Sequence, residues 1–531
     1  MAAMEKIAVV IILLAIVTAL FQVTDKIKIP YPILLVLAGM GIGLVPHLPV
    51  VSLDPDIVFL IFLPPVLYAS AWNTSWGDFK KSIRPISLLA VGCVLFTTII
   101  VGYVAHYLIP GFGWAESFVL GAIISPPDAV AAAAATKGLN LPKRIITILE
   151  GESLVNDATG LIAYRYGIAA VGAGSFIFWL ASVNFIYVAG FGVIIGFLVG
   201  VVFLWIHKIT PDNPLADTTL TFLTPYTAYL IAERFHASGV LAVVVAGLYL
   251  SQRASQIFNH QTRIQANLVW QTVIFLLNGL IFILIGLQLP LILKEIKEVS
   301  FGQLILYGSV ISLATIIARI LWVFPGAFIP RWFSKKIRAR EPETTVKSVS
   351  IVAWSGMRGI VSLAAALALP LMIEDTTPFP NRDLIIFLTF SVIFSTLVIQ
   401  GLTLPKLISW LKIAAGDHEL EEERKARLKL AYEVIEHIEE NYSINVDDTV
   451  LNQLKTKYEI RIQRIRKDET NKSLTIELID QFHNLRAELI KKEREVIHRM
   501  SKNGEISDEI MRKIERELDL EESRMILEKE Y

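Results

Sequence analysis

The chain has 531 residues, of which 54% are hydrophobic and only 18% are charged. Soluble globular chains are nearer one quarter charged, so this composition argues against a soluble protein and indicates a membrane protein. The net charge is zero, but residues 414–531 carry a net charge of −7 and the residues before them +7. The single cysteine, Cys93, excludes an intrachain disulfide and a cysteine-rich metal site.

Apolar segments recur through the first 413 residues, whereas a helix needs about 20 mostly apolar residues to cross the hydrocarbon of a bilayer. The first segment lacks a small-residue cleavage site, so we expect it to be a retained helix rather than a signal peptide. We expect an all-α polytopic membrane protein, with a transmembrane domain over 1–413 and a charged, helical, cytoplasmic domain over 414–531. The predicted spans, about thirteen, lie near 7–24, 30–46, 56–72, 85–108, 115–136, 145–171, 178–206, 216–234, 237–252, 268–289, 302–328, 350–373 and 384–412.

Loop charge predicts the orientation of these spans. If the N-terminus is outside, the inner loops carry 17 Lys and Arg residues and the outer loops carry only 4. Basic residues are in excess on cytoplasmic loops, so we expect an external N-terminus and a cytoplasmic C-terminus.

The fifth predicted span contains Ser125, Pro126, Pro127 and Asp128 in succession. Two prolines remove backbone donors and break the helix, and carbonyls freed in this way can coordinate cations in transporters. Asp128 follows the break, where it either neutralises the positive end of the second half-helix or helps to attract cations.

The sixth predicted span carries the strongest chemical signal, because it holds ionisable groups at membrane depth. Ser153 and Asp157 share one helix face, and Asn156 is adjacent to Asp157. Carboxylate, amide and hydroxyl oxygens are hard ligands that suit a small alkali cation. A single carboxylate holds either a proton or a sodium ion, so we expect Asp157 to be the exchange site.

Glu152 lies about 140° from Asp157 around the helix, and its burial would require a cation. Arg358, between two glycines in the twelfth predicted span, is the expected partner. Arg319 in the eleventh span is either a helix-packing cation or a charge that lines a cavity. The segment 233–239 is either an outer turn with a local Glu–Arg pair, or a site on the ion pathway or one that senses pH.

The last 118 residues differ in kind from the rest. Leu430, Val434 and Ile438 lie at helical spacing among many charges, which predicts amphipathic helices. Such helices pack on themselves or on a second protomer; a solvated extension without a regulatory role is the alternative. Basic residues are balanced by acids here, so we do not expect nucleic acid as a partner.

Several of these motifs together resemble one family. Residues 62–65, 125–131, 151–157, 233–239 and 356–359 are similar to the bacterial sodium/proton antiporters of the cation:proton antiporter-1 family, relatives of the animal sodium/proton exchangers. The resemblance spans residues 7–412. It implies a homodimer with thirteen helices in inverted repeats, two broken helices that cross near the site, and an elevator-like movement of a core domain.

By position, the resemblance makes Asp157 the ion-binding carboxylate, Ser153 a ligand, and Glu152 with Arg358 the stabilising pair. Asn156 matches the residue that marks electroneutral exchange. One residue departs from the pattern, since many relatives have a small or hydroxyl residue where this chain has Pro127, so a hydroxyl ligand is absent there.

We therefore expect exchange of Na+ for H+ across the cell membrane, without a cofactor. The alternatives are the same exchange with K+ or Li+, and a non-transporting membrane sensor or scaffold. No phosphate-binding loop, nucleophile triad or zinc pattern stands out in the sequence, so we expect neither an enzyme nor an ATP-driven pump.

Overall fold

The structure is a computed structural model. It describes residues 2–27, 29–45, 55–136, 139, 141–173, 178–210, 213–296, 299–341, 344–373, 377–413, 417–442, 448–467, 472–503, 505 and 508–529. The chain divides into two compact units, a membrane unit (Met1–Ala415) and a C-terminal unit (Gly416–Tyr531). This division lies two residues beyond the boundary expected at residue 413.

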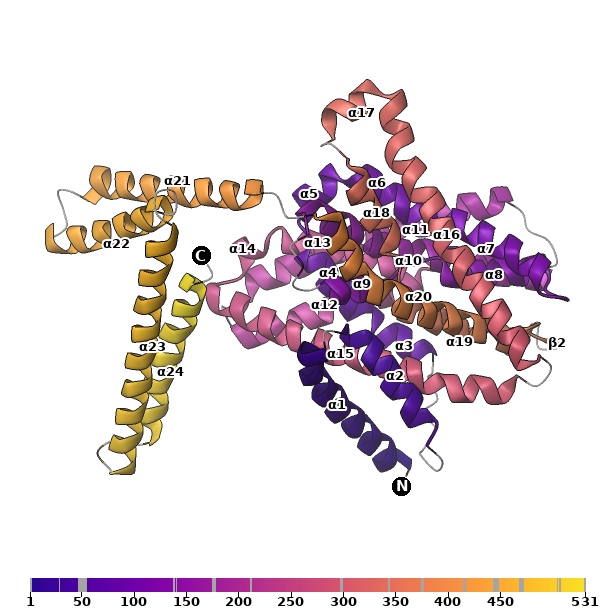
Figure 1. The fold of residues 1–531 in the computed structure, drawn as a ribbon, viewed down its shortest axis with the longest axis horizontal. Helices are drawn as coiled ribbons and strands as arrows, with labels where there is room; N and C mark the ends of the chain where they lie inside the picture. Colours follow the sequence, from indigo (N-terminus) through magenta and orange to yellow (C-terminus); the bar gives the residue numbers. More distant parts are fainter. Residues whose placement is uncertain are drawn as a thin grey trace. The chain divides into compact units, whose positions relative to one another are not determined.

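Helices make up nearly all of the membrane unit (Figure 1). In its described part, the other regular elements are a short π-helical segment and one pair of two-residue antiparallel strands. The elements are α1 (Ala2–Ile27), α2 (Tyr31–Gly43), α3 (Pro55–Ile61), α4 (Leu63–Asn73), α5 (Trp76–Lys81), α6 (Ile83–Ser87), η1 (Leu88–Cys93), α7 (Val94–Leu108), α8 (Trp114–Ile124), α9 (Ala129–Thr136), α10 (Lys143–Ala173), α11 (Phe178–Ile209), α12 (Pro214–Arg234), α13 (Gly239–Ser251), α14 (Ala254–Ile257), α15 (His260–Glu295), α16 (Phe301–Phe333), α17 (Lys335–Arg340), α18 (Val346–Trp354), α19 (Ile360–Leu367), β1 (Met372–Ile373), β2 (Thr377–Pro378) and α20 (Arg382–Leu411).

Six stretches of helix among the described residues are long and apolar enough to cross a membrane, and four shorter apolar helices accompany them. The six are Ile83–Leu108, Trp114–Thr136, Val183–Ile209, His260–Lys294, Phe301–Phe333 and Arg382–Leu411. Helix α10 falls outside this group because charged side chains interrupt its apolar sequence. The helical fold class is thus confirmed, whereas thirteen crossings remain a prediction.

Two helices are broken where the sequence contains Pro or Gly. One break separates α8 from α9 at residues 125–128, and the other separates α18 from α19 at residues 355–359. The two breaks touch, because the backbone N–H of Asp128 donates a hydrogen bond to the carbonyl of Met357 (2.7 Å). A side chain at Gly359 would overlap the Asp128 carboxylate, so only glycine permits this approach.

Helix α10 packs between two hydrophobic clusters of the membrane unit. Ile145 and Tyr164 belong to a cluster built largely from α2, α7, α8, α15, α16 and α20. Leu154 and Ala158 belong to a second cluster, with residues of α4, α11, α12 and α13. Dense packing on both sides fixes the rotation of α10, and therefore the direction in which its polar residues point.

One end of α10 is held by an ionic cluster around Glu341. The carboxylate of Glu341 accepts two hydrogen bonds from Arg84 (2.5 and 2.7 Å), and the guanidinium groups of Arg144 and Arg331 lie 3.8 Å away. The hydrogen bonds from Arg84 hold the pKa of Glu341 below its usual range. Arg144 belongs to the first turn of α10, so the cluster joins α10 to the loop that follows α17.

The C-terminal unit consists of four helices, which pair as hairpins (Figure 1). They are α21 (Asp417–Tyr442), α22 (Asp448–Lys467), α23 (Lys472–Lys502) and α24 (Asp508–Lys529). Ile490 and Ile497 of α23 pack against Leu518 of α24. Ile438 is buried, but Leu430 of the predicted apolar face is 65% exposed.

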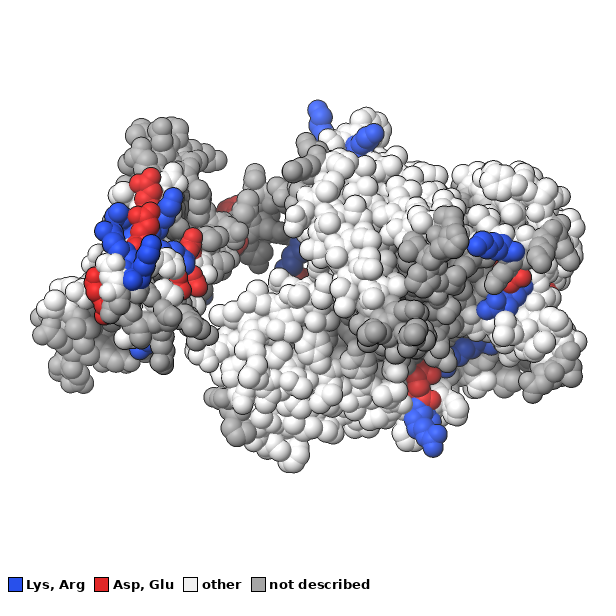
Figure 2. Space-filling model, turned by 90° about the horizontal axis from the view of Figure 1, so that it is seen from below, with Lys and Arg blue, Asp and Glu red and all other residues white. Residues whose placement is uncertain are grey.

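The two units have different surfaces. Figure 2 shows one face of the molecule, on which uncharged residues cover most of the membrane unit and charged residues gather on the C-terminal unit. An apolar outer surface suits contact with lipid, which a soluble protein of this size would not expose.

Candidate functional site

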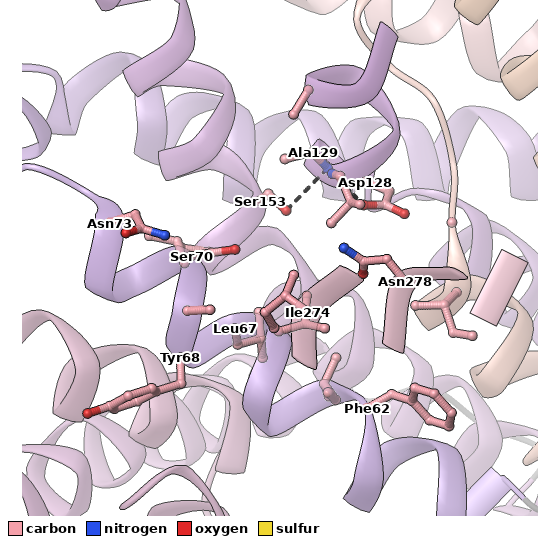
Figure 3. Close-up of a pocket in the computed structure, with 18 of the residues that line it drawn as sticks. Phe62, Leu67, Tyr68, Ser70, Asn73, Asp128, Ala129, Ser153, Ile274 and Asn278 are labelled. Carbon is pink, nitrogen blue, oxygen red and sulfur yellow. Dashed lines mark hydrogen bonds between the residues drawn. The ribbon is translucent and has the colours of Figure 1, made fainter. Parts of the chain in front are cut away.

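The candidate site centres on one face of α10. Ser153 and Asp157, together with Glu150, line a cavity of about 720 Å³. Figure 3 shows Ser70 and Asn73 of α4 on one side of this cavity, and Asp128 and Asn278 on the other.

Asp157 is the central residue of this face. Its side chain is 8% exposed, and no described residue donates a hydrogen bond to its carboxylate or forms an ion pair with it. A buried carboxylate without a protein partner requires a proton or a cation to compensate its charge. The structure therefore leaves Asp157 available to a ligand.

Asn156 and Ser153 connect α10 to the first break. The amide nitrogen of Asn156 donates to the carbonyl of Pro127 (2.6 Å), and the hydroxyl of Ser153 accepts a hydrogen bond from the backbone N–H of Ala129 (3.4 Å; Figure 3). The amide oxygen of Asn156 is fully buried and has no partner among the described residues. Such an oxygen is costly to bury unless a ligand or water reaches it.

Asp128 caps the start of α9 and also lines the same cavity. Its carboxylate accepts a hydrogen bond from the N–H of Val130 (2.8 Å), in the first turn of α9. A negative charge there also neutralises the positive end of the helix dipole. The proline ring of Pro126 packs against Gly160 of α10, which brings the break close to the helix that carries Asp157.

The structure corrects the expected partner of Glu152. Glu152 forms a bidentate ion pair with Arg319 of α16 (2.6 and 2.8 Å), and both side chains are 1% exposed. Arg319 also donates to the carbonyl of Val352, at the end of α18. The predicted pair of Glu152 with Arg358 is wrong, because Arg319 already satisfies both carboxylate oxygens.

Arg358 is bound by carbonyl groups instead. It donates to the carbonyl of Ile124 (2.7 Å), at the C-terminal end of α8, and to that of Gly356 in its own break. Its backbone N–H donates to the hydroxyl of Thr396 (3.1 Å). A helix C-terminus carries partial negative charge, so Arg358 joins the two broken helices without a carboxylate.

Sequence reasoning missed two features of this arrangement. Arg319 had no predicted partner, although it is one of four arginines inside the predicted spans, with Arg165, Arg234 and Arg358. Glu150 had not been singled out, although it lies seven residues before Asp157 and so shares its helix face. The missed signal was the i, i+3, i+7 spacing of Glu150, Ser153 and Asp157.

Comparisons with known proteins show the family of the chain. The family described as "Sodium/hydrogen exchanger, transmembrane" matches residues 10–410. The chain is 32% identical over 548 residues to a protein of Escherichia coli K12 named as the uncharacterized Na+/H+ exchanger YjcE, covering 98% of each chain. It is 31% identical over 517 residues to a sodium, potassium, lithium and rubidium/H+ antiporter of Bacillus subtilis, covering 95% of this chain and 76% of that protein.

A solved structure shares the fold. The sodium proton antiporter MjNhaP1 of Methanocaldococcus jannaschii, at pH 8, superposes with a TM-score of 0.62 and 22% identity. The match covers 77% of this chain and 99% of that chain. The solved structure shows the shared fold, and the family match over residues 10–410 confirms the resemblance found in the sequence motifs.

Proposed function

We propose, since this chain belongs to the sodium/hydrogen exchanger family, that it exchanges one Na+ for one H+ at Asp157 across the cell membrane. One observation carries the proposal: Asp157 is a buried carboxylate that lines a large cavity and has no partner among the described residues. Sodium and a proton each compensate this charge, and they compete for it.

The residues around Asp157 restrict the competition between Na+ and H+ to the carboxylate of Asp157. Glu152 is neutralised by Arg319, and Asp128 is held by the first turn of α9. Asn156 adds an amide rather than a second acid. Loading Asp157 with one Na+ or one H+ therefore changes the charge of the site by the same amount, which supports electroneutral one-to-one exchange.

Oxygen ligands for sodium are present beside Asp157. The hydroxyl of Ser153 and the unpartnered amide oxygen of Asn156 belong to the same two turns of α10. Pro127 supplies no hydroxyl, and its carbonyl already accepts the Asn156 amide. The ion would therefore be held mainly by α10, with Asp128 of the break nearby.

Alternating access completes the mechanism. The elements that hold the site, α8 to α10 and α16 to α20, would move together as a core past the remaining helices, in an elevator-like step. Thirteen crossings in inverted repeats, a homodimer, an external N-terminus and a cytoplasmic C-terminus belong to the same proposal. In that orientation the large cavity opens to the cytoplasm, because Arg263 of the basic inner loops lines it.

Purified full-length protein in liposomes that contain a pH-sensitive dye tests the proposal. An imposed Na+ gradient should drive proton movement, and a clamped membrane potential should leave the rate unchanged. Current coupled to exchange would contradict the one-to-one stoichiometry. The absence of flux with any alkali cation would leave the alternative of a non-transporting membrane sensor or scaffold.

A second candidate is exchange of K+ or Li+ by the same site. The name of the Bacillus subtilis relative includes potassium, lithium and rubidium, and the missing hydroxyl at Pro127 removes one small-cation ligand. The same assay run with each chloride salt separates these cations.

A further inference from the structure

We infer that Glu150 is a second site of cation attraction on the transport path. Its carboxylate draws a hydrated alkali cation into the cavity before the cation reaches Asp157. This inference rests on the proposed function. It assigns to Glu150 a task distinct from binding at Asp157: raising the local concentration of the substrate rather than holding it during transport.

Helix geometry places Glu150 on the path. Seven residues of α-helix turn through nearly two full turns, so Glu150 and Asp157 lie about 20° apart around α10 and about 10 Å apart along it. Ser153 lies between them, and all three line the same cavity. The side chain of Glu150 leans toward the N-terminal end of α10, away from Asp157.

Glu150 has no protein partner to explain its position. Within the described part of the chain, no residue donates a hydrogen bond to its carboxylate or forms an ion pair with it. Glu152, two residues later, points about 160° away and is neutralised by Arg319. Two acids in one turn thus have opposite roles, because only Glu152 faces an arginine.

The charges along the cavity favour a cation. Among the described residues, three acids line it (Asp128, Glu150 and Asp157) against one basic residue, Arg263, whose guanidinium donates to the carbonyl of Phe258 (2.8 Å). Apolar walls of low dielectric concentrate the field of such charges and raise the local concentration of counter-ions. Water occupies about 30 Å³ per molecule in the liquid, so the cavity is large enough for a cation with its hydration shell.

The test compares Na+-dependent proton flux of the full-length protein and its variants in liposomes. Glu150→Gln should raise KM for Na+ about three- to tenfold at low ionic strength and leave the maximal rate nearly unchanged. Glu150→Asp should retain most of the wild-type KM, and Arg263→Gln should lower KM. Added N-methylglucamine chloride should shrink each difference, because salt screens charges that act through water.

Chemical rescue separates charge from packing. In a Cys93→Ser background, which has no other cysteine, Glu150→Cys should show a raised KM. A negatively charged sulfonate thiol reagent should restore a low KM, and a positively charged ammonium reagent should raise KM further. If Glu150→Gln does not fold, this series and Arg263→Gln decide the question.

Two outcomes would overturn the inference. One is a wild-type KM in Glu150→Gln at low ionic strength; the other is a raised KM that neither salt nor the sign of the reagent's charge alters. Failure of the proposed function looks different, because wild-type protein would then show no cation-dependent flux at all.

Discussion

The two halves of α10 have contrasting surroundings. Residues 150–157 of the first half border the cavity of about 720 Å³, with Glu150 and Asp157 unpartnered among the described residues. Residues 158–165 of the second half border a cavity of only about 80 Å³, lined largely by apolar and aromatic side chains. There, Arg165 forms an ion pair with Glu233 of α12 (2.8 Å).

Because of this difference, Asp157 is accessible from the first half of α10 and not from the second. Asp157 stands at the division, since Ala158 already belongs to the small cavity. In the proposed mechanism a cation reaches Asp157 along the first half, whereas the second half is lined by apolar side chains and by the Arg165–Glu233 ion pair. Alternating access requires the second half of α10 to become open to a cation while the first half becomes closed.

The largest effect should come from the residue at the division itself. Asp157→Asn removes the charge that Na+ and H+ compete for, so cation-dependent proton flux in liposomes should fall to background. The variant should remain folded in detergent, because it relieves a buried, unpaired charge. Asp383→Asn, at a side chain that is 46% exposed, is the control, and substantial flux in Asp157→Asn would refute the central role of Asp157.

The next largest effect concerns the buried ion pair between Glu152 of α10 and Arg319 of α16. Glu152→Gln leaves the guanidinium of Arg319 without its anion, and loss of one partner of a buried pair costs about 3–5 kcal/mol. Thermal unfolding in detergent should show a marked fall in Tm, which the double variant Glu152→Gln/Arg319→Met should partly recover. An unchanged Tm in Glu152→Gln would show that the pair does not stabilise the fold.

The closed half of α10 can be opened by removing its ion pair. In a Cys93→Ser background, Leu161→Cys places a thiol in the small cavity. Adding Arg165→Gln or Glu233→Gln should raise the rate at which a membrane-impermeant maleimide labels this thiol when the reagent is added on the side of the membrane nearer the small cavity. Arg234→Gln, one residue from Glu233, is the matched control. Equal labelling in all variants would assign the closure to apolar contacts alone.

The smallest effect lies at the end of α10. The pKa of Glu341 is held low by Arg84, so its ionised form stabilises the folded state above the unfolded pKa and this stabilisation disappears as acid protonates it. Glu341→Gln should cost about 1 kcal/mol at neutral pH. The Tm difference from wild type should shrink at strongly acidic pH; a difference that is independent of pH would exclude the ionised carboxylate as its cause.

Hydrophobicity and motif spacing predicted much of the fold and the site. Apolar runs indicated a helical membrane protein, and Pro126 with Pro127 indicated the first broken helix. The segment from Glu152 to Asp157 identified the helix that carries the acids, because polar residues at membrane depth are costly unless they have a task.

Two features required three dimensions. Both Arg319 and Arg358 are buried, and only packing decides which guanidinium reaches Glu152. Arg358 instead finds carbonyls at a helix end, partners that exist only because α8 stops at Ile124. The number of crossings also depends on how polar helices are counted, since the predicted span 145–171 lies in α10, which is not among the six long apolar stretches of the described residues.

The contact between the two breaks has a consequence for how this site tolerates variation. It joins the N–H of Asp128 to the carbonyl of Met357, so it uses only groups that nearly every residue carries. Most side chains around it can change without removing this hydrogen bond, whereas Gly359 must stay glycine because a side chain there would overlap the Asp128 carboxylate. Among single substitutions at 128, only proline would remove the donor. Asp128→Pro should therefore break the hydrogen bond between the two breaks, whereas Asp128→Asn should keep it.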